Sequence, residues 1–531
     1  MQVQDFLKLI DGKIITGSGK TVVNDFCKDS RLVRKNGAYI AIIGEKFDGN
    51  DFVEKAIDAG ASVCIISKEN ANVVEKAKKN NTTLILVANT LKALQGIAKY
   101  KRSLFNIPVV AVTGSVGKTS TKDMIASVLS SKYSTLKTKG NMNNNIGMPM
   151  TILELNDENA MVVEMGMNHF GEIELLTDIA KPTIAVVTNI GTAHIGNLGS
   201  RENILKAKLE ILDGMKKKIL VINNDNDLLH KFYLENKDNP EIEMHTYGIE
   251  NESKVMGYNI KLGEDSSWFD CKIDSELEKK SCANNDLIRE NHAIDNGLEN
   301  KSCVNNVSIR GNQAIDNELE NKSSINNALI RKQNIIDNDV NNEFSVEVPV
   351  GGLHFIYNSL CAITVANLLN LNQSEIKCGI KNFVPTKNRM DITKLNNGVT
   401  VINDSYNASF DSMQMLLNYL SNFTAKRRIA VLGDMLELGD YSKELHEKVG
   451  KEVSKNNVDI LIVSGENSKY IAEKAIKDGM NKENVYYFEN GDKIYNFIKK
   501  IWRDGDCILF KASNGMRFFE IADKLIAECG K

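Results

Sequence analysis

Short apolar runs alternate with amphipathic stretches over two long parts of the chain, one between residues 106 and 230 and one after residue 385. Such runs, bounded by polar turns, are typical of buried strands. The strands predicted in the first part are Val109–Thr113, Met161–Glu164, Ile184–Thr188 and Lys218–Asn223. Those predicted in the second part are Arg428–Leu432, Asp459–Val463, Val485–Phe488 and Asp506–Phe510. Because helical segments separate the strands, each part is expected to form a mostly parallel sheet covered by helices.

The length of the chain indicates several domains. Its 531 residues exceed what one hydrophobic core usually holds. Residues 1–105 carry shorter strand and helix patterns, such as the apolar run 38–43. We therefore expect an α/β protein with three domains: a small N-terminal α/β domain at 1–105, a central parallel-sheet domain at 106–384 and a Rossmann-like domain at 385–531. The last lacks the Gly-x-Gly-x-x-Gly fingerprint of a dinucleotide site.

A repeat with a period of 21 residues interrupts the central part, and its copies begin at Leu277, Leu298 and Leu319. Its many asparagines and sparse apolar positions argue against a solenoid or a coiled coil. We expect a disordered or weakly helical surface insertion at 275–342. The flanks 267–274 and 344–349 alternate apolar and polar residues, which predicts a hairpin with the insertion at its tip.

Composition narrows the class of protein. A formal net charge of −3 gives no indication of the basic surface that binding to nucleic acid or to an anionic membrane requires. The first residues lack the apolar core of a signal peptide, and no apolar run is long enough to span a bilayer. The nine cysteines include no Cys-x-x-Cys pair, and Cys64 and Cys507 fall in apolar runs as small core residues would. We expect a cytoplasmic monomer.

The segment after the first predicted strand of the central part has the form of a phosphate-binding loop. A glycine-bracketed turn, Gly114 to Gly117, joins that strand to a helix predicted at 118–130. Glycines let the backbone bend so that its N–H groups point at phosphate oxygens, Lys118 adds a positive charge, and the Thr119 hydroxyl can bind Mg²⁺. Val112 stands where the full motif has glycine. The expected phosphate-contacting residues are Gly114, Ser115, Val116, Gly117, Lys118, Thr119 and Ser120.

Other chemical groups follow the next strands in order. Glu164 ends one predicted strand, His194 follows another, and Lys208 lies in a helical stretch after it. Each is weak evidence alone, because strands often end in a carboxylate and a lone histidine or lysine is usually structural or solvated. The carboxyl ends of parallel strands meet at one edge of a sheet, so the set as a whole predicts a nucleotide and metal site there.

These stretches resemble the Mur ligase family of ATP-dependent amide ligases. The resemblance covers nearly the whole chain except the repeat. It is most specific at Glu164–Ile173 and Gly433–Gly439, which are similar to the members that add a dipeptide, whereas the phosphate loop is shared with the whole family and with folylpolyglutamate synthase. The other matching stretches are 29–31, 44–52, 113–124, 140–149, 403–408 and 511–513. This chain departs from the family at Phe355, Ser409, Phe410 and Ala512.

The resemblance implies roles for individual residues. Lys118, Glu164, His194 and Lys208 would be catalytic. Thr119 and Glu164 would hold one Mg²⁺, and His194 a second together with a carbamylated Lys208. The remaining nucleotide contacts would come from Asn145, Asn358, Arg389 and Asp404. The UDP end of the substrate would be bound by Ser30, Arg31 and Lys46.

The resemblance also implies a reaction. ATP would phosphorylate the terminal carboxylate of UDP-N-acetylmuramoyl-tripeptide, and the amine of D-alanyl-D-alanine would displace the phosphate. Two alternatives stay open: a related ligase that adds a single amino acid, and a nucleotide-binding scaffold whose repeat recruits partners.

Overall fold

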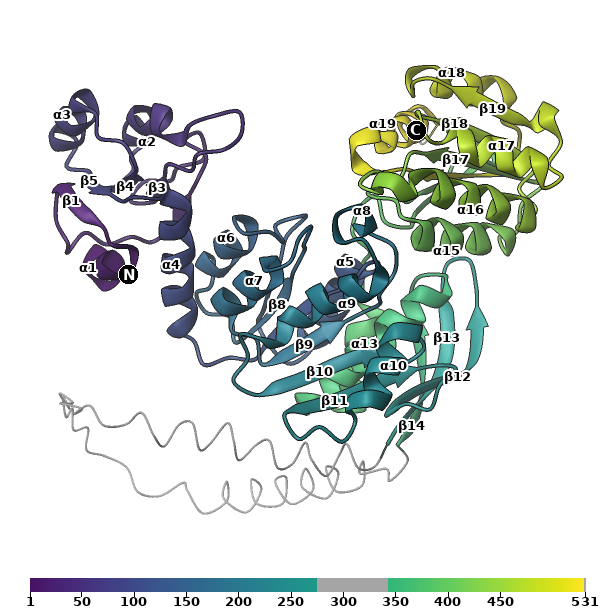
Figure 1. The fold of residues 1–531 in the computed structure, drawn as a ribbon, viewed down its shortest axis with the longest axis horizontal. Coiled ribbons are helices and arrows are strands. Elements are labelled where there is room, and N and C mark those ends of the chain that lie inside the picture. The colour runs from purple at the N-terminus through teal and green to yellow at the C-terminus, as the bar shows by residue number, and fades with distance from the viewer. Residues whose placement is uncertain (275–341, 530–531) are drawn as a thin grey trace, which may run out of the picture.

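The computed structural model describes residues 1–274 and 342–529, and these form three α/β domains, each built on its own sheet. The domains follow one another along the chain, with the central domain between the other two (Figure 1). The predicted fold class is confirmed. The predicted repeat insertion lies outside the described residues except for Asn342.

The N-terminal sheet has the strand order β1-β5-β4-β3-β2, in which only β1 is antiparallel to its neighbour. Helix α4 (Thr90–Ser103) is capped by Asn89, whose side chain accepts hydrogen bonds from two backbone N–H groups of the first turn. The same helix contacts the central domain, where Arg102 Nε donates to Ala180 O at 2.8 Å. The other elements are α1 (Val3–Leu7), β1 (Lys13–Thr16), β2 (Phe26–Cys27), β3 (Ala38–Ile40), α2 (Val53–Asp58), β4 (Val63–Ile66), α3 (Ala71–Lys79) and β5 (Thr83–Leu86).

The central sheet has nine strands within the described residues, in the order β14-β13-β12-β11-β10-β9-β6-β8-β7. Strands from β7 to β12 are parallel to their neighbours, and β13 and β14 add an antiparallel edge. The parallel strands are β6 (Val109–Thr113), β7 (Thr135–Lys137), β8 (Ala160–Glu164), β9 (Ile184–Val187), β10 (Lys218–Asn223), β11 (Ile242–Gly248) and β12 (Val255–Leu262). Of these, β6, β8 and β9 are buried at every residue, as expected of short strands that are covered on both faces.

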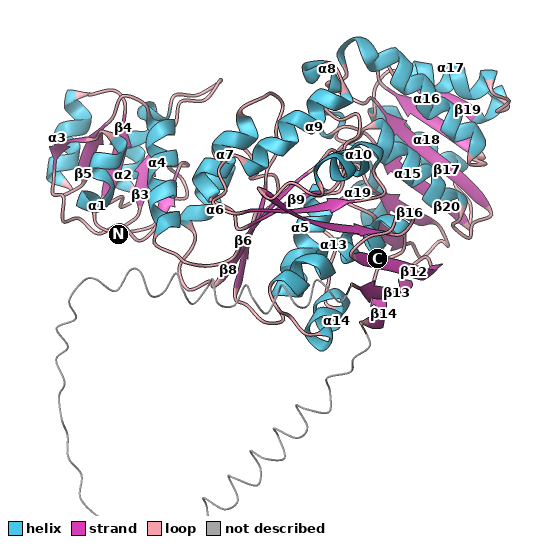
Figure 2. Cartoon of the chain, turned by 60° about the horizontal axis from the view of Figure 1, so that its bottom comes forward, coloured by secondary structure: helices cyan, strands magenta, loops and turns pink. Residues whose placement is uncertain are grey.

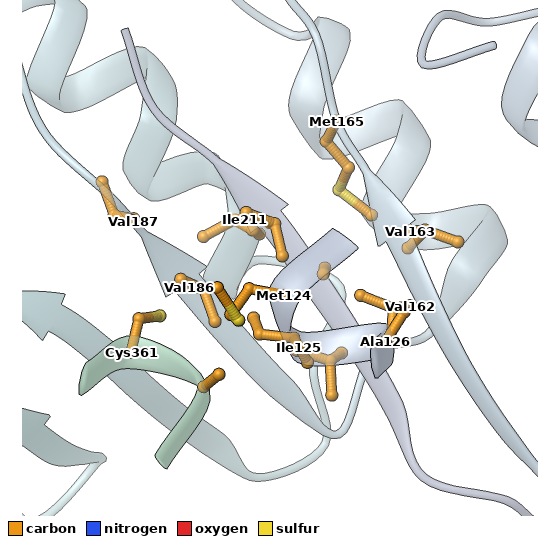
Figure 3. Packing of buried hydrophobic residues seen from close by; sticks show 14 of the residues in the cluster. Met124, Ile125, Ala126, Val162, Val163, Met165, Val186, Val187, Ile211 and Cys361 are labelled. Atoms are coloured by element: carbon orange, nitrogen blue, oxygen red, sulfur yellow. The ribbon is translucent and has the colours of Figure 1, made fainter. Parts of the chain in front are cut away.

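Helix α5 (Lys118–Leu129) lies at the centre of the central core. Figure 3 shows its Met124 and Ile125 among side chains of β8 and β9, such as Val162 and Val186, all of them buried. Helix α13 (Leu353–Leu368) packs on α5 and brings distant residues to the same core. The remaining helices are α6 (Gly147–Leu153), α7 (Glu172–Ala180), α8 (Ile195–Leu198), α9 (Arg201–Leu209), α10 (Asp227–Asn236) and α14 (Gln373–Lys381).

The flanks of the repeat pair as the alternating pattern predicts. Strand β13 (Ser267–Ile273) and strand β14 (Glu343–Val348) are antiparallel, with Ser267 opposite Val348 and Lys272 opposite Glu343. Ile273 N also donates to Asn342 O at 2.8 Å. The insertion therefore connects the two paired ends of this edge.

The C-terminal sheet has the order β15-β16-β20-β17-β18-β19, and only β15 is antiparallel. Figure 2 shows these strands side by side with helices beside them. The strands are β15 (Asp391–Lys394), β16 (Thr400–Asn403), β17 (Arg427–Gly433), β18 (Ile460–Ser464), β19 (Val485–Phe488) and β20 (Asp506–Lys511). The helices are α15 (Phe410–Ser421), α16 (Ser442–Lys455), α17 (Lys469–Lys477), α18 (Asp492–Ile501) and α19 (Phe518–Cys529). Among the helices of the described residues, none combines the length and the apolar character needed to cross a membrane.

Candidate active site

The turn between β6 and α5 depends on its two glycines. Gly114 has φ +151° and Gly117, which caps α5, has φ +82°. A Cβ atom on Gly114 would lie 1.9 Å from Thr188 Oγ1, so another residue here would displace the Thr188 side chain and would be strained at this φ. The backbone is thus free to bend toward a bound anion at the start of a helix.

The strand end after β9 supports this turn. Asn189 Oδ1 accepts hydrogen bonds from Ser115 N at 3.1 Å and Val116 N at 2.8 Å, and Thr188 Oγ1 donates to Val116 O at 2.8 Å. These contacts fix the loop before any ligand arrives. Sequence reasoning missed Asn189, because its partners lie more than seventy residues earlier in the chain.

Lys118 lies over the loop. Its Nζ donates to Gly114 O at 2.8 Å. Desolvation and the nearby Arg389 lower the pKa of Lys118, and the negative charge of Glu164 opposes the shift. The ammonium is therefore adjacent to a carboxylate and to the bend of the loop, where a phosphate would bind.

Thr119 and Glu164 form the oxygen-rich part of the site. Thr119 Oγ1 donates to Glu164 Oε2 at 2.8 Å, and Asn143 Nδ2 donates to Glu164 Oε1 at 2.8 Å. Glu164 is only 2% exposed. The sequence predicted Thr119 and Glu164 but missed Asn143, which belongs to the same asparagine-rich stretch as the predicted Asn145.

His194 lies at the boundary with the C-terminal domain. It precedes α8 with φ +64°, and its Nδ1 is 2.8 Å from Glu437 Oε2. The imidazole lowers the pKa of the Glu437 carboxyl. Glu437 itself has φ +63°, so two non-glycine residues in the left-handed region face each other across the boundary.

Lys208 is buried in α9. Its side chain is 1% exposed, and within residues 1–274 and 342–529 no carboxylate pairs with it. Desolvation and the positive charge of Lys118 lower its pKa well below the ordinary value. No group of three His, Cys, Asp or Glu side chains able to hold a metal occurs in these same residues. A metal site here would thus depend on Thr119 and on a modified Lys208 besides Glu164 and His194.

The C-terminal domain contributes a buried ion pair. Lys511 Nζ is 2.5 Å from Asp404 Oδ2 and also donates to Asn407 O at 2.9 Å. Desolvation lowers the pKa of Lys511, and Asp404 opposes the shift. Nearby, the guanidinium of Arg389 stacks on the ring of Tyr406, with 4.2 Å between its Cζ and the ring centroid.

A cavity of about 110 Å³ joins the phosphate loop to this ion pair. Three buried polar atoms at its walls, Ser115 Oγ, Asn358 Nδ2 and Arg389 Nε, have no hydrogen-bond partner among the described residues. Buried polar atoms are nearly always hydrogen-bonded, so their grouping indicates a place for a polar ligand. The predicted nucleotide residues that line the cavity are Ser115, Val116, Gly117, Lys118, Thr119, Ser120, Asn358, Arg389 and Asp404.

A larger cavity of about 550 Å³ opens beside the first, and Lys118 and Arg389 line both. Glu164, His194 and Asn145 face it from the central domain. Its C-terminal wall is formed by Arg389 and by residues of three loops: Tyr406, Asn407, Ala408, Ser409, Leu436, Glu437, Leu438, Ser513, Asn514 and Gly515. The predicted residues Ser30, Arg31 and Lys46 line neither cavity and lie in the N-terminal domain, Ser30 buried and the other two exposed.

The C-terminal domain is hydrogen-bonded to the loop that carries His194. Asp411 Oδ2 accepts from both Thr192 N and Thr192 Oγ1 at 2.8 Å, and the Tyr441 hydroxyl donates to Gly199 O at 2.6 Å. In Figure 1, α8 accordingly lies beside the C-terminal domain. The walls of both cavities are therefore held together across the domain boundary.

Comparison with family models matches each domain in turn. Residues 27–102 match "Mur ligase family, catalytic domain", residues 112–288 match "Mur ligase middle domain", and residues 388–514 match "Mur ligase, glutamate ligase domain".

Full-length relatives give the same result. The chain is 31% identical to the UDP-N-acetylmuramoyl-tripeptide–D-alanyl-D-alanine ligase of Bacillus subtilis, over 96% of this chain and 94% of that protein. It is 32% identical to the enzyme of the same name from Synechocystis, over 95% and 92%. Among solved structures, MurF from Acinetobacter baumannii aligns with a TM-score of 0.77 at 24% identity, over 99% and 98% of the two chains. MurF from Thermotoga maritima in complex with ADP aligns with a TM-score of 0.72 at 24% identity, over 95% and 98%.

Proposed function

Because this chain belongs to the Mur ligase family, we propose that it joins D-alanyl-D-alanine to UDP-N-acetylmuramoyl-tripeptide with the hydrolysis of ATP. One structural observation supports an ATP-driven ligase above all. A phosphate loop in one domain and a buried ion pair in another line a single cavity, and that cavity adjoins a larger cleft suited to two further substrates. The relatives' names give the identity of those substrates.

ATP fits the smaller cavity. The loop amides and Lys118 would contact its phosphates, and the unpartnered Arg389 Nε would add a further donor. Asn358 Oδ1 already accepts from Thr121 Oγ1 at 2.8 Å, which leaves its Nδ2 free to donate to the base. The contacts of Arg389 Nε and Asn358 Nδ2 would each satisfy a buried donor that has no hydrogen-bond partner among the described residues.

The hydroxyl of Thr119 and the carboxylate of Glu164 are hard oxygen ligands of the kind that Mg²⁺ prefers, and they are already 2.8 Å apart. Asn143 donates to the other oxygen of this carboxylate and thereby orients it. A magnesium ion held there would neutralise charge on the phosphate oxygens during phosphoryl transfer.

We further propose that Lys208 is carbamylated. A lysine becomes a nucleophile toward CO₂ only when it is neutral, and burial without a carboxylate partner favours the neutral amine. Its nitrogen would bond to the carbon of CO₂ and lose one proton. The resulting anionic oxygens would serve, with His194, as ligands of a second Mg²⁺.

The remaining residues orient the organic substrates. In the N-terminal domain, Ser30, Arg31 and Lys46 would bind the UDP end, and the tripeptide would extend toward the larger cleft. A carboxylate oxygen of the tripeptide would attack the γ-phosphorus while ADP leaves. The ammonium of the dipeptide would lose one proton to solvent, and the resulting amine would attack the acyl carbon. Inorganic phosphate would leave with the bonding electron pair, and the nitrogen would give up a second proton as the amide forms. Lys118 stabilises the charge that moves during the first step.

The choice of acceptor tests the proposal. Purified protein with ATP, Mg²⁺ and UDP-N-acetylmuramoyl-tripeptide should release phosphate when D-alanyl-D-alanine is present and negligibly with any single amino acid. A free amino acid that works better than the dipeptide would assign the chain to another branch of the family. Release that needs no acceptor would contradict a ligase. We also propose that the enzyme acts in the cytoplasm and that it is a monomer. Sedimentation of the purified chain would check the oligomeric state.

A further inference from the structure

Three carboxylates line the larger cleft, and they differ in the hydrogen bonds that they already accept from the protein. Glu164 accepts from Thr119 and Asn143. Glu172 Oε2 accepts from Asn168 N at 2.6 Å. Glu437 accepts no hydrogen bond from a backbone amide or a hydroxyl of the described residues, and its side chain is 56% exposed. It is therefore the carboxylate of this cleft with the most capacity left for a ligand.

The loop that carries Glu437 is held firmly by its own domain. Met435 N donates to His446 Nε2 at 3.0 Å, and Leu436 N donates to Ser513 Oγ at 2.9 Å. Ser513 N in turn donates to Asp434 O at 3.1 Å. Because these bonds fix the two residues before it, Glu437 is presented to the cleft in its left-handed conformation rather than free to turn away.

The position of Glu437 suits a positively charged ligand. It faces the cleft from the C-terminal domain, whereas Lys118 and Glu164 face it from the central domain. His194 Nδ1 lies 2.8 Å from Oε2, and no hydrogen bond or ion pair to Oε1 occurs within the described residues. The other charged group of the C-terminal wall is Arg389, a cation. An ammonium group that enters this cleft would thus find its counter-ion on that wall at Glu437.

We propose that Glu437 binds the α-ammonium of the acceptor dipeptide and thereby orients its nitrogen toward the acyl carbon of the tripeptide, which the nitrogen attacks after the ammonium has released one proton to solvent. This inference rests on the proposed ligase function and extends it to the acceptor site. An ion pair also explains discrimination: an acceptor without a free amino group loses the contact and cannot react.

The experiment compares two ligands in two proteins. Steady-state KM for D-alanyl-D-alanine and Ki for propionyl-D-alanine, which lacks only the amino group, are measured with the wild type and with Glu437→Gln. A hydrogen bond to a charged group is worth ~1.5–3 kcal/mol, so the KM should rise about 10- to 100-fold in the variant. The Ki should stay within about 2-fold, because the analogue has no ammonium to lose.

A second readout separates this role from support of His194. Hydroxylamine traps an acyl phosphate as a hydroxamate without any need for the dipeptide. Glu437→Gln should form hydroxamate at nearly the wild-type rate. Loss of hydroxamate formation with an unchanged KM for the dipeptide would overturn the inference and make Glu437 a residue that positions His194.

Controls keep the outcomes distinct. Glu444→Gln removes an exposed carboxylate of α16 that pairs with Lys448, and it should alter neither constant. Thermal melting of each full-length variant reports its folding, and Glu437→Asp repeats the test with the charge retained and should recover part of the affinity. Equal rises of KM and Ki in Glu437→Gln would also overturn the inference. A wild type that shows no phosphate release with the dipeptide would instead refute the proposed function.

Discussion

The central sheet contains the same amide–carboxylate contact in two different surroundings. At the carboxyl ends of the parallel strands, Asn143 Nδ2 donates to the buried Glu164 at 2.8 Å. On the antiparallel edge, Asn259 Nδ2 donates to Asp270 at 2.9 Å in an exposed position. The first pair adjoins a phosphate loop, a lysine and a cleft, whereas the second belongs to a solvent-facing surface.

The difference shows that position in the sheet, rather than the pair itself, determines its use. Parallel strands deliver their carboxyl ends, together with the N-termini of helices, to one edge, so charged groups accumulate where a ligand can reach them. The antiparallel edge presents alternating side chains to solvent, where an ion pair or hydrogen bond contributes little. Substitutions at the carboxyl ends of the parallel strands should therefore lower activity, and substitutions on the antiparallel edge should not.

Lys118→Ala should give the largest effect. Removing a charge that stabilises the transferring phosphoryl group commonly lowers kcat by about 10²-fold or more. Steady-state phosphate release measures it, with a melting curve to show that the fold is intact. Lys272→Ala, which removes an exposed lysine from the antiparallel edge, should keep wild-type activity. Wild-type turnover in a folded Lys118→Ala protein would contradict the assigned site.

Lys208→Ala should also be inactive, and short carboxylic acids should restore part of its activity by supplying an anionic oxygen ligand. Lys206→Ala is the matched control, because Lys206 is exposed on the same helix two residues earlier. Mass spectrometry of the intact wild type under CO₂ should find the added carbamate. Full activity of Lys208→Ala without a rescuing acid would show that no carbamate is needed for the reaction.

Asn143→Ala should raise the Mg²⁺ concentration for half-maximal activity about 10- to 100-fold, as expected for a residue that orients a metal ligand. A magnesium titration of the reaction rate measures this. Asn259→Ala breaks the equivalent contact on the antiparallel edge and should leave the titration unchanged. If both variants behave alike, the comparison between the two regions fails.

Lowering the pH should reduce the free energy of unfolding through His354, a residue that lines the nucleotide cavity. Desolvation lowers the pKa of His354 from 6.5 to about 4. The unfolded chain therefore binds more protons than the folded one between pH 6.5 and about 4, and the free energy of unfolding falls as the pH drops through this window. The loss between pH 7 and 5 should be about 2 kcal/mol. Urea denaturation at both pH values should show a smaller loss for His354→Gln than for the wild type or for the exposed His169→Gln.

Replacing residues 275–341 by a short Gly/Asn turn should have the smallest effect. Lys272 and Glu343 are already paired, and closing a shorter loop changes the entropy by only ~0.6 kcal/mol per doubling of length. Ligase activity should remain within a few-fold of the wild type, and the melting temperature should be nearly unchanged. A soluble deletion variant without activity would make the repeat a working part of the enzyme.

The sequence predicted the parallel strands well because a strand buried on both faces must be a short apolar run. Val109–Thr113, which is buried throughout, agrees with the structure at both ends, and so do the less buried strands Lys218–Asn223 and Val485–Phe488. The phosphate loop was predictable for a similar reason, since its glycines, lysine and threonine are adjacent in sequence. The hairpin flanks were predictable from their alternation.

The supporting residues were not predictable, because their partners are distant in the chain. Asn143 could not be told from Asn141, Asn144 or Asn145 by pattern, and only the fold brings it to Glu164. Glu437 meets His194 across a domain boundary that no local periodicity encodes. Roles that depend on such contacts require the structure.

An isotope experiment tests most directly whether the tripeptide carboxylate is activated by phosphorylation. UDP-N-acetylmuramoyl-tripeptide labelled with ¹⁸O in its terminal carboxylate is incubated with ATP, Mg²⁺, D-alanyl-D-alanine and the enzyme. We expect each phosphate released to carry one ¹⁸O atom, and one amide to form per phosphate. Unlabelled phosphate accompanied by amide formation would contradict an acyl phosphate, and with it the proposed roles of the phosphate loop and the cleft.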